Sequence, residues 1–285
     1  MFIRKEDFNE VKIIPSILVY LLMNFGIIFA VSIVDNSILN NTNIIQLFID
    51  CMFILYLFFK FGVNLRKLNN LIHDFIEKIN IKEIINVVFT QILVSLGTTL
   101  LMLAIICFID LDMANSLNNS SDDLFTSTVV FFILTVITAP ILEELLFRVV
   151  FFKRLSRVFD VYVGMIASSI IFGILHVELA VVGAIIFGIA NCILYLKYRN
   201  ILIPMTVHFL NNLIVSIPTL FSSADSISGA ESELLTLNDA STYLIVGIIT
   251  LIVGLFLFIR FIIQNRKYIE RDAFDMKTYK FDSLL

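Results

Sequence analysis

Three short patterns of polar side chains interrupt apolar runs that hold very few other ionisable groups. They comprise Glu143, Glu144 and Arg148; His176; and His208 with Asn212. An ionisable group inside a membrane-spanning helix is costly, so each is a candidate functional residue. Carboxylates and imidazoles accept and return protons, and an amide donates hydrogen bonds to a developing negative charge. The patterns therefore indicate hydrolysis or proton transfer.

Helical spacing separates the two glutamates. Glu144 and Arg148 are four residues apart, the spacing at which side chains pair on one helix face. Glu143 is rotated by about 100° from Glu144 and has no obvious partner on its own helix. His208 and Asn212 are also four apart and share a face. We predict a supporting ion pair between Glu144 and Arg148, and an open carboxylate at Glu143.

The register of two neighbouring helices brings a histidine level with this carboxylate. If the chain turns near Phe159–Asp160, Glu143 and His176 lie equally far from the turn. This arrangement requires the first helix to continue past Arg148 and the second to be short or tilted. We predict such a hairpin.

Pro140 lies just before the glutamates. A proline inside a helix removes one backbone hydrogen bond, here to the carbonyl of Val136, and kinks the helix. Irregular backbone at membrane depth is tolerated mainly where it faces protein or a wet cavity. We therefore expect water to reach Glu143.

The composition is that of a membrane protein. Of 285 residues, 59% are hydrophobic and 15% are charged, whereas soluble domains carry about 25% charged residues. Apolar runs of roughly twenty residues span a bilayer as helices, and eight occur. They are Ile13–Val34, Ile44–Val63, Ile84–Ile109, Leu124–Phe147, Val161–Val177, Leu179–Leu196, Ile201–Leu220 and Tyr243–Ile263. We predict an all-α polytopic membrane helix bundle of about eight spans.

Lysine and arginine lie in alternate connections. With the N-terminus inside, the outer loops at about 35–43, 111–123 and 221–242 contain neither residue. Basic residues favour the cytoplasmic side of a membrane, so both termini are predicted to be cytoplasmic. We expect one transmembrane domain over residues 1–264, a cytoplasmic tail over 265–285, and an amphipathic helix along the inner interface at Leu65–Ile79.

The three patterns resemble the motifs EExxxR, FxxxH and HxxxN of the CPBP family, the CAAX proteases and bacteriocin-processing enzymes also called Abi. Here the second motif begins at Phe172. The resemblance covers about residues 125–220, the predicted protease core. It implies a helical intramembrane endopeptidase whose site opens to the cytoplasm. It also implies that Glu143, helped by His176, activates water, while His208 and Asn212 hold the oxyanion.

The resemblance leaves the cofactor open. The family has been classed with metalloproteases, and Glu143, His176 and His208 would give zinc or another divalent metal three ligands and an open position. The compact HExxH motif of zinc proteases is absent. Resemblance to structurally described relatives favours a metal-free glutamate mechanism.

Other interpretations remain. A non-proteolytic member of the scaffold would act in bacteriocin self-immunity or bind a regulatory partner. A small transporter would use Glu143 as a proton carrier, but no repeated halves are visible. Taken singly, His176 and His208 are each consistent with an ordinary interhelical hydrogen bond.

The expected partners are membrane lipids and a membrane-associated protein or peptide substrate in the cell membrane. The substrate is either prenylated or a peptide such as a pheromone or bacteriocin leader. No nucleic-acid-binding patch and no phosphate-binding glycine loop occur in the sequence.

Overall fold

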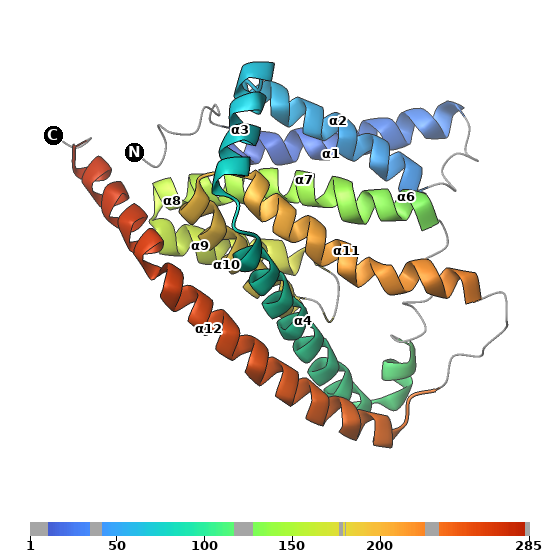
Figure 1. The fold of residues 1–285 in the computed structure, drawn as a ribbon. Helices are drawn as coiled ribbons and strands as arrows, with labels where there is room; N and C mark the ends of the chain where they lie inside the picture. The colour runs from blue at the N-terminus through green and yellow to red at the C-terminus, as the bar shows by residue number, and fades with distance from the viewer. Residues whose placement is uncertain are drawn as a thin grey trace.

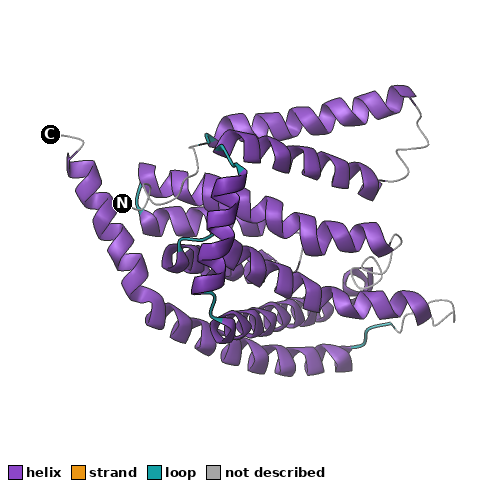
Figure 2. Ribbon diagram, turned by 45° about the horizontal axis from the view of Figure 1, so that its top comes forward, coloured by secondary structure: helices purple, strands orange, loops and turns teal. Residues whose placement is uncertain are grey.

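The computed structural model describes residues 11–34, 42–116, 128–176, 179, 181–225 and 234–282. These residues form helices joined by short connections, without a strand among them (Figures 1 and 2). The predicted all-α membrane bundle is confirmed. Residues 35–41, 117–123 and 226–233 of the expected outer loops lie outside the described residues, and the orientation of the chain stays a prediction.

Every predicted apolar run falls on a helix. The first half of the chain comprises α1 (Ile13–Val34), α2 (Thr42–Phe61), α3 (Leu65–Lys78) and α4 (Ile81–Ile109). A long rod follows, made of α6 (Thr128–Phe132), η2 (Ile133–Thr138), α7 (Ala139–Glu144), η3 (Leu145–Phe152) and α8 (Lys153–Val158). The rest comprises α9 (Val161–Ile174), α10 (Val181–Tyr198), α11 (Leu202–Asp225) and α12 (Leu237–Asp282).

Among the described residues, six helices are long and apolar enough to cross a membrane. The other two apolar helices, Val161–Ile174 and Leu202–Ile217, are shorter. At 1.5 Å per residue the 14 residues of α9 reach only about 21 Å, less than the roughly 30 Å of a bilayer core. The number of crossings therefore stays a prediction, while the short fifth run agrees with the expected hairpin.

The helices are stacked in layers (Figure 1). The α1–α2 hairpin covers one side of the long rod, α9, α10 and α11 lie on its other side, and α4 and α12 form the far layer. In the apolar stretch of α10, 67% of the residues are buried, against 6% in the apolar stretch of α1. The core therefore surrounds α10, and α1 presents most of its surface to lipid.

The predicted hairpin is present. The long rod continues past Arg148 to Val158, and α9 begins at Val161. The Asp160 side chain accepts a hydrogen bond of 2.8 Å from the Val163 amide and so caps α9. A side chain at Gly164 would clash with the Ser156 backbone, which shows how closely the two arms approach.

The C-terminal part of α12 bonds to the turn between α10 and α11. Arg199 in this turn has a φ of 55° and pairs with Asp272, whose side chain is fully buried. Arg271 donates a hydrogen bond of 3.0 Å to the Leu196 carbonyl. The segment predicted as a tail from residue 265 therefore begins as a continuation of α12, and its first turns pack on the bundle.

Candidate active site

Glu144 is completely buried and is surrounded by donors. Its carboxylate forms the predicted ion pair with Arg148, with Nε 2.9 Å from Oε2 and Nη2 3.3 Å from Oε1. Asn191 donates to Oε1 at 2.9 Å, and Nδ1 of His208 lies 3.0 Å from the same oxygen. A buried charge with this many partners holds helices together. Glu144 thus ties the long rod to α10 and α11.

Glu143 has different surroundings. Its side chain is 27% exposed, and its Oε2 has no hydrogen-bond partner among the described residues. The Nε2 atoms of His208 and His176 lie 3.7 and 4.0 Å from this oxygen. The structure therefore brings three of the predicted site residues together, and it confirms that His176 lies level with Glu143.

The hydrogen bonds at the other ring nitrogens indicate the tautomers. Nδ1 of His176 lies 2.8 Å from the Phe172 carbonyl, and Nδ1 of His208 lies 3.0 Å from Glu144. A carbonyl or carboxylate oxygen only accepts, so both Nδ1 atoms carry hydrogen. Each Nε2 then presents a lone pair toward Glu143 when its ring is neutral. Three acceptors then converge, and a water molecule with two hydrogens satisfies two of them.

Phe172 explains the aromatic position of the second motif. Its side chain is 1% exposed, and its ring centroid lies 4.4 Å from that of His176 and 6.0 Å from that of His208. The Arg148 guanidinium lies over the same ring at 5.1 Å. One phenylalanine therefore fixes both imidazoles through packing and His176 also through its carbonyl.

The helix is irregular at Pro140. The segment before it, η2, is a π-helix, in which the Ala139 amide donates to the Leu134 carbonyl. Continued in this register, an amide at position 140 would face the carbonyl of Thr135, and proline has none to donate. Asn212 donates to the Thr135 carbonyl at 2.8 Å.

Asn212 therefore anchors α11 to the irregular turn in front of the glutamates. It hydrogen-bonds to Thr135 and Asn211 and to neither glutamate. The amide nitrogen has a second hydrogen that these bonds do not use up. The predicted role of Asn212 at the oxyanion stays a prediction.

Two buried polar residues are not singled out by the sequence patterns. Asn191 on α10 completes the shell of Glu144, and Asp50 on α2 is 7% exposed beside Tyr20 and Gln46. The signal that found the other residues, a polar side chain inside an apolar run, is present at both positions. Their roles differ, because only Asn191 belongs to the site.

The predicted metal ligands do not form a metal site in this structure. Among the described residues, no three His, Cys, Asp or Glu side chains are grouped closely enough to hold a metal ion. Zinc bonds to nitrogen and oxygen are about 2.0–2.2 Å long, which places neighbouring ligands closer together than the 3.7 and 4.0 Å found here.

Fold and site together define a polytopic membrane protein with carboxylates and imidazoles grouped inside a helix bundle. Residues 125–214 match the family model described as type II CAAX prenyl endopeptidase, Rce1-like. All three motifs lie within this segment, and the resemblance to the CPBP family of CAAX-type proteases is confirmed.

One curated relative is YdiL of Bacillus subtilis (strain 168), provisionally named a membrane peptidase. It is 30% identical over 99 residues, which are 34% of this chain and 41% of that protein. The match thus spans less than half the length of the relative. No solved structure matches the chain significantly.

Proposed function

We propose that this protein is an intramembrane endopeptidase that hydrolyses a peptide bond of a membrane-associated protein or peptide. One observation carries the proposal: the Glu143 side chain is 27% exposed, and its buried Oε2, without a hydrogen-bond partner among the described residues, faces the Nε2 atoms of two histidines. Glu143 and His176 are two acceptors that suit a water molecule about to lose a proton. The match over residues 125–214 supports the same class of reaction.

In the proposed reaction, Glu143 and His176 orient the water. Glu143 removes one proton while the water oxygen bonds to the carbonyl carbon of the substrate. The carbonyl π electrons move to its oxygen, which becomes the oxyanion. Glu143 then delivers the proton to the amide nitrogen as the carbon–nitrogen bond breaks, and the products are a carboxylic acid and an amine.

The oxyanion is stabilised by His208 and Asn212 in this proposal. For this role Nε2 of His208 carries a hydrogen, while its Nδ1–H bonds to the Glu144 carboxylate. Asn212 contributes the hydrogen of its amide that Thr135 does not take. Donors fixed in an apolar interior stabilise such an anion strongly.

The proposed substrate approaches from the membrane, with the site opening to the cytoplasmic side. The family model that matches residues 125–214 is described as a prenyl endopeptidase. A prenylated C-terminal peptide is therefore one proposed substrate class. A peptide precursor without a prenyl group is the other.

Cleavage is tested with the full-length protein, purified and reconstituted into vesicles with membrane proteins from the expression host. New peptide N-termini are identified by mass spectrometry. A synthetic CAAX-type peptide, with and without a farnesyl group, is assayed in parallel. Wild-type protein is expected to generate N-termini that are absent with Glu143→Gln.

The matched control is Asp50→Asn, which changes a buried carboxylate away from the site. Equal cleavage by wild-type protein and Glu143→Gln would contradict the proposed chemistry. If neither wild-type protein nor Glu143→Gln cleaved any protein, and both bound the same partner protein equally, the chain would be a binding scaffold instead.

A further inference from the structure

A second polar region lies on the other face of α10, between α4 and α12. These two helices pack closely midway along α4, where a side chain at Gly97 would clash with the Leu251 backbone and one at Gly254 with the Val94 side chain. Toward the start of α4 they diverge (Figure 1). The diverging ends leave a pocket of about 530 Å³, within the range of small-molecule sites.

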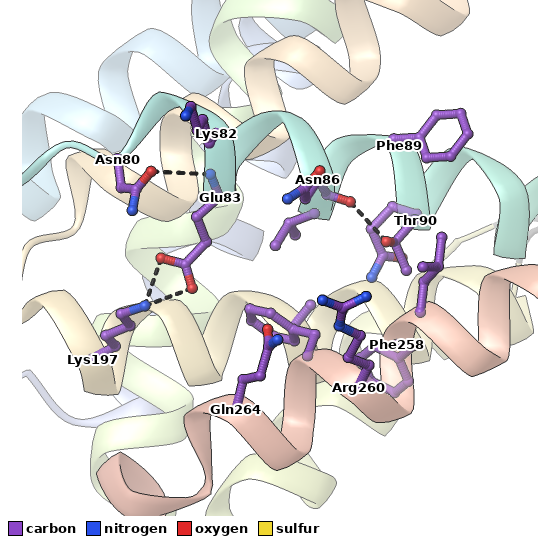
Figure 3. A pocket seen from close by; sticks show the side chains of 15 residues that line it. Asn80, Lys82, Glu83, Asn86, Phe89, Thr90, Lys197, Phe258, Arg260 and Gln264 are labelled. Atoms are coloured by element: carbon purple, nitrogen blue, oxygen red, sulfur yellow. Dashed lines mark hydrogen bonds and ion pairs between the residues drawn. The ribbon is translucent and has the colours of Figure 1, made fainter.

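The pocket is polar at one end and apolar at the other. Figure 3 shows Arg260 and Gln264 extending from α12 toward α4, with Asn86 and Thr90 opposite Arg260. Apolar lining residues from three helices complete the walls. They include Val87, Phe89, Ala190, Leu257, Phe258 and Phe261.

The one carboxylate in the lining, Glu83, is already neutralised. Lys197 lies 2.6 Å from both of its oxygens, and the Tyr198 hydroxyl and the Asn265 amide also donate to it. Arg260 has no ion pair or hydrogen bond within the described part of the chain, and neither does Lys82 at the rim. The pocket therefore has an excess of positive charge.

Gln91 gives an independent sign of a missing ligand. It lines the pocket and is 1% exposed, yet neither its amide oxygen nor its amide nitrogen has a hydrogen-bond partner among the described residues. A buried amide without a partner is unfavourable, so native structures nearly always satisfy it with protein, water or a ligand. A ligand with hydrogen-bond acceptors and donors would satisfy both atoms.

The pocket lies at the boundary between apolar and polar sequence. The apolar part of α12 ends at Ile263 and is followed by Gln264, Asn265 and Arg266, while Lys82 and Lys197 lie at ends of α4 and α10. Lipid headgroups lie at such a boundary in a membrane. Basic pockets between membrane helices at this level bind anionic headgroups.

We propose that the pocket between α4, α10 and α12 binds an anionic glycerophospholipid. Arg260 holds the phosphate, Lys82 adds attraction at the rim, and Gln91 binds the glycerol or ester oxygens. The apolar walls take the upper acyl chains. Ala190 lines this pocket while its neighbour Asn191 contacts Glu144, so the lipid site and the proposed active site lie on different faces of α10.

The test uses full-length protein in a non-ionic detergent and measures Kd for three probes. These are dioctanoyl phosphatidylglycerol, dioctanoyl phosphatidylcholine and glycerol 3-phosphate. Phosphatidylglycerol is expected to bind most tightly. Arg260→Gln should weaken its binding about fivefold, the effect of one basic residue near an anionic surface. Gln91→Met, which keeps the volume but removes the amide, should also weaken it.

The matched control is Arg66→Gln, which removes an exposed arginine on α3, outside the pocket. Equal Kd values for the two lipids, or equal weakening by Arg66→Gln and Arg260→Gln, would overturn the proposal. Binding of glycerol 3-phosphate as tight as that of phosphatidylglycerol would assign the pocket to a soluble phosphate and exclude the lipid. The lipid-free Tm of Gln91→Met should equal that of wild-type protein, because the amide that is removed has no partner in the described structure. Weaker lipid binding at an unchanged Tm would then show a defective site and not a misfolded protein.

Discussion

Two carboxylates placed in the membrane bundle, Asp50 and Glu143, have opposite surroundings. Asp50 lies between α1 and α2, where its Oδ1 accepts hydrogen bonds of 3.0 Å from Tyr20 and 2.8 Å from Gln46. Glu143 lies on the long rod, where its Oε2 has no hydrogen-bond partner and faces two imidazoles. Asp50 is 7% exposed, whereas the Glu143 side chain is 27% exposed.

The difference shows that a carboxylate inside a membrane helix is not by itself a sign of chemistry. Asp50 accepts from Tyr20 on α1 and from Gln46 on its own helix, and so joins α1 to α2. Glu143 keeps an oxygen without a hydrogen-bond partner among the described residues, which a reaction with water requires. Glu144, the next residue along the chain, resembles Asp50 in this respect because its carboxylate is buried and bonded.

The largest effect is expected when the open carboxylate is replaced. Glu143→Gln keeps the shape of the side chain but removes the base, and general acid–base catalysis contributes about 10²–10⁴-fold. The initial rate at which new N-termini appear should fall by at least about 100-fold, with an unchanged Tm. A rate near that of wild-type protein would place the base elsewhere.

The supporting ion pair is expected to control stability. Arg148→Met leaves Glu144 buried without its cation, and breaking such a pair costs about 3–5 kcal/mol. The Tm in detergent should fall strongly, and Arg66→Met on the exposed face of α3 should leave it unchanged. If both variants melted like wild-type protein, Glu144 would not depend on Arg148.

A smaller loss is expected in the other cluster. Asp50→Asn keeps the volume but weakens the bonds from Tyr20 and Gln46, at a cost of about 1 kcal/mol. The Tm should fall slightly while cleavage continues at the wild-type rate. Loss of cleavage in a folded Asp50→Asn protein would give α1 and α2 a part in the reaction.

No effect is expected from metal removal. The spacing of Glu143, His176 and His208 does not suit a metal ion, so dialysis against a chelator should leave the cleavage rate unchanged. If chelation abolished cleavage and zinc restored it, these three side chains would have to move together as ligands, and Glu143 would no longer be an open carboxylate.

The residue-level features that depend on helical spacing could be predicted from the sequence. Pairing of Glu144 with Arg148 follows from a separation of four residues. The position of His176 beside Glu143 follows from counting equal distances to one turn, and the observed cap at Asp160 lies where that turn was expected. Both inferences need only a regular helix and a tight connection.

Features that depend on irregular backbone or on packing angles could not be predicted in this way. The π-helical turn places the Thr135 carbonyl where Asn212 donates to it, and a proline alone does not specify that register. Asn191 contacts Glu144 because α10 lies beside the long rod, which no local pattern encodes. The pocket at Gln91 likewise depends on the divergence of α4 from α12.

The unbroken course of α12 has a mechanical consequence. Its 46 residues extend for about 69 Å, more than twice the thickness of a bilayer core. In its C-terminal part, Asp272 and Arg271 bond to the turn between α10 and α11. These two helices carry Asn191 and His208. These contacts couple α12 to that turn, so a displacement of the helix near Asp272 reaches the turn. A fusion tag for purification is therefore safer at the N-terminus than at the C-terminus.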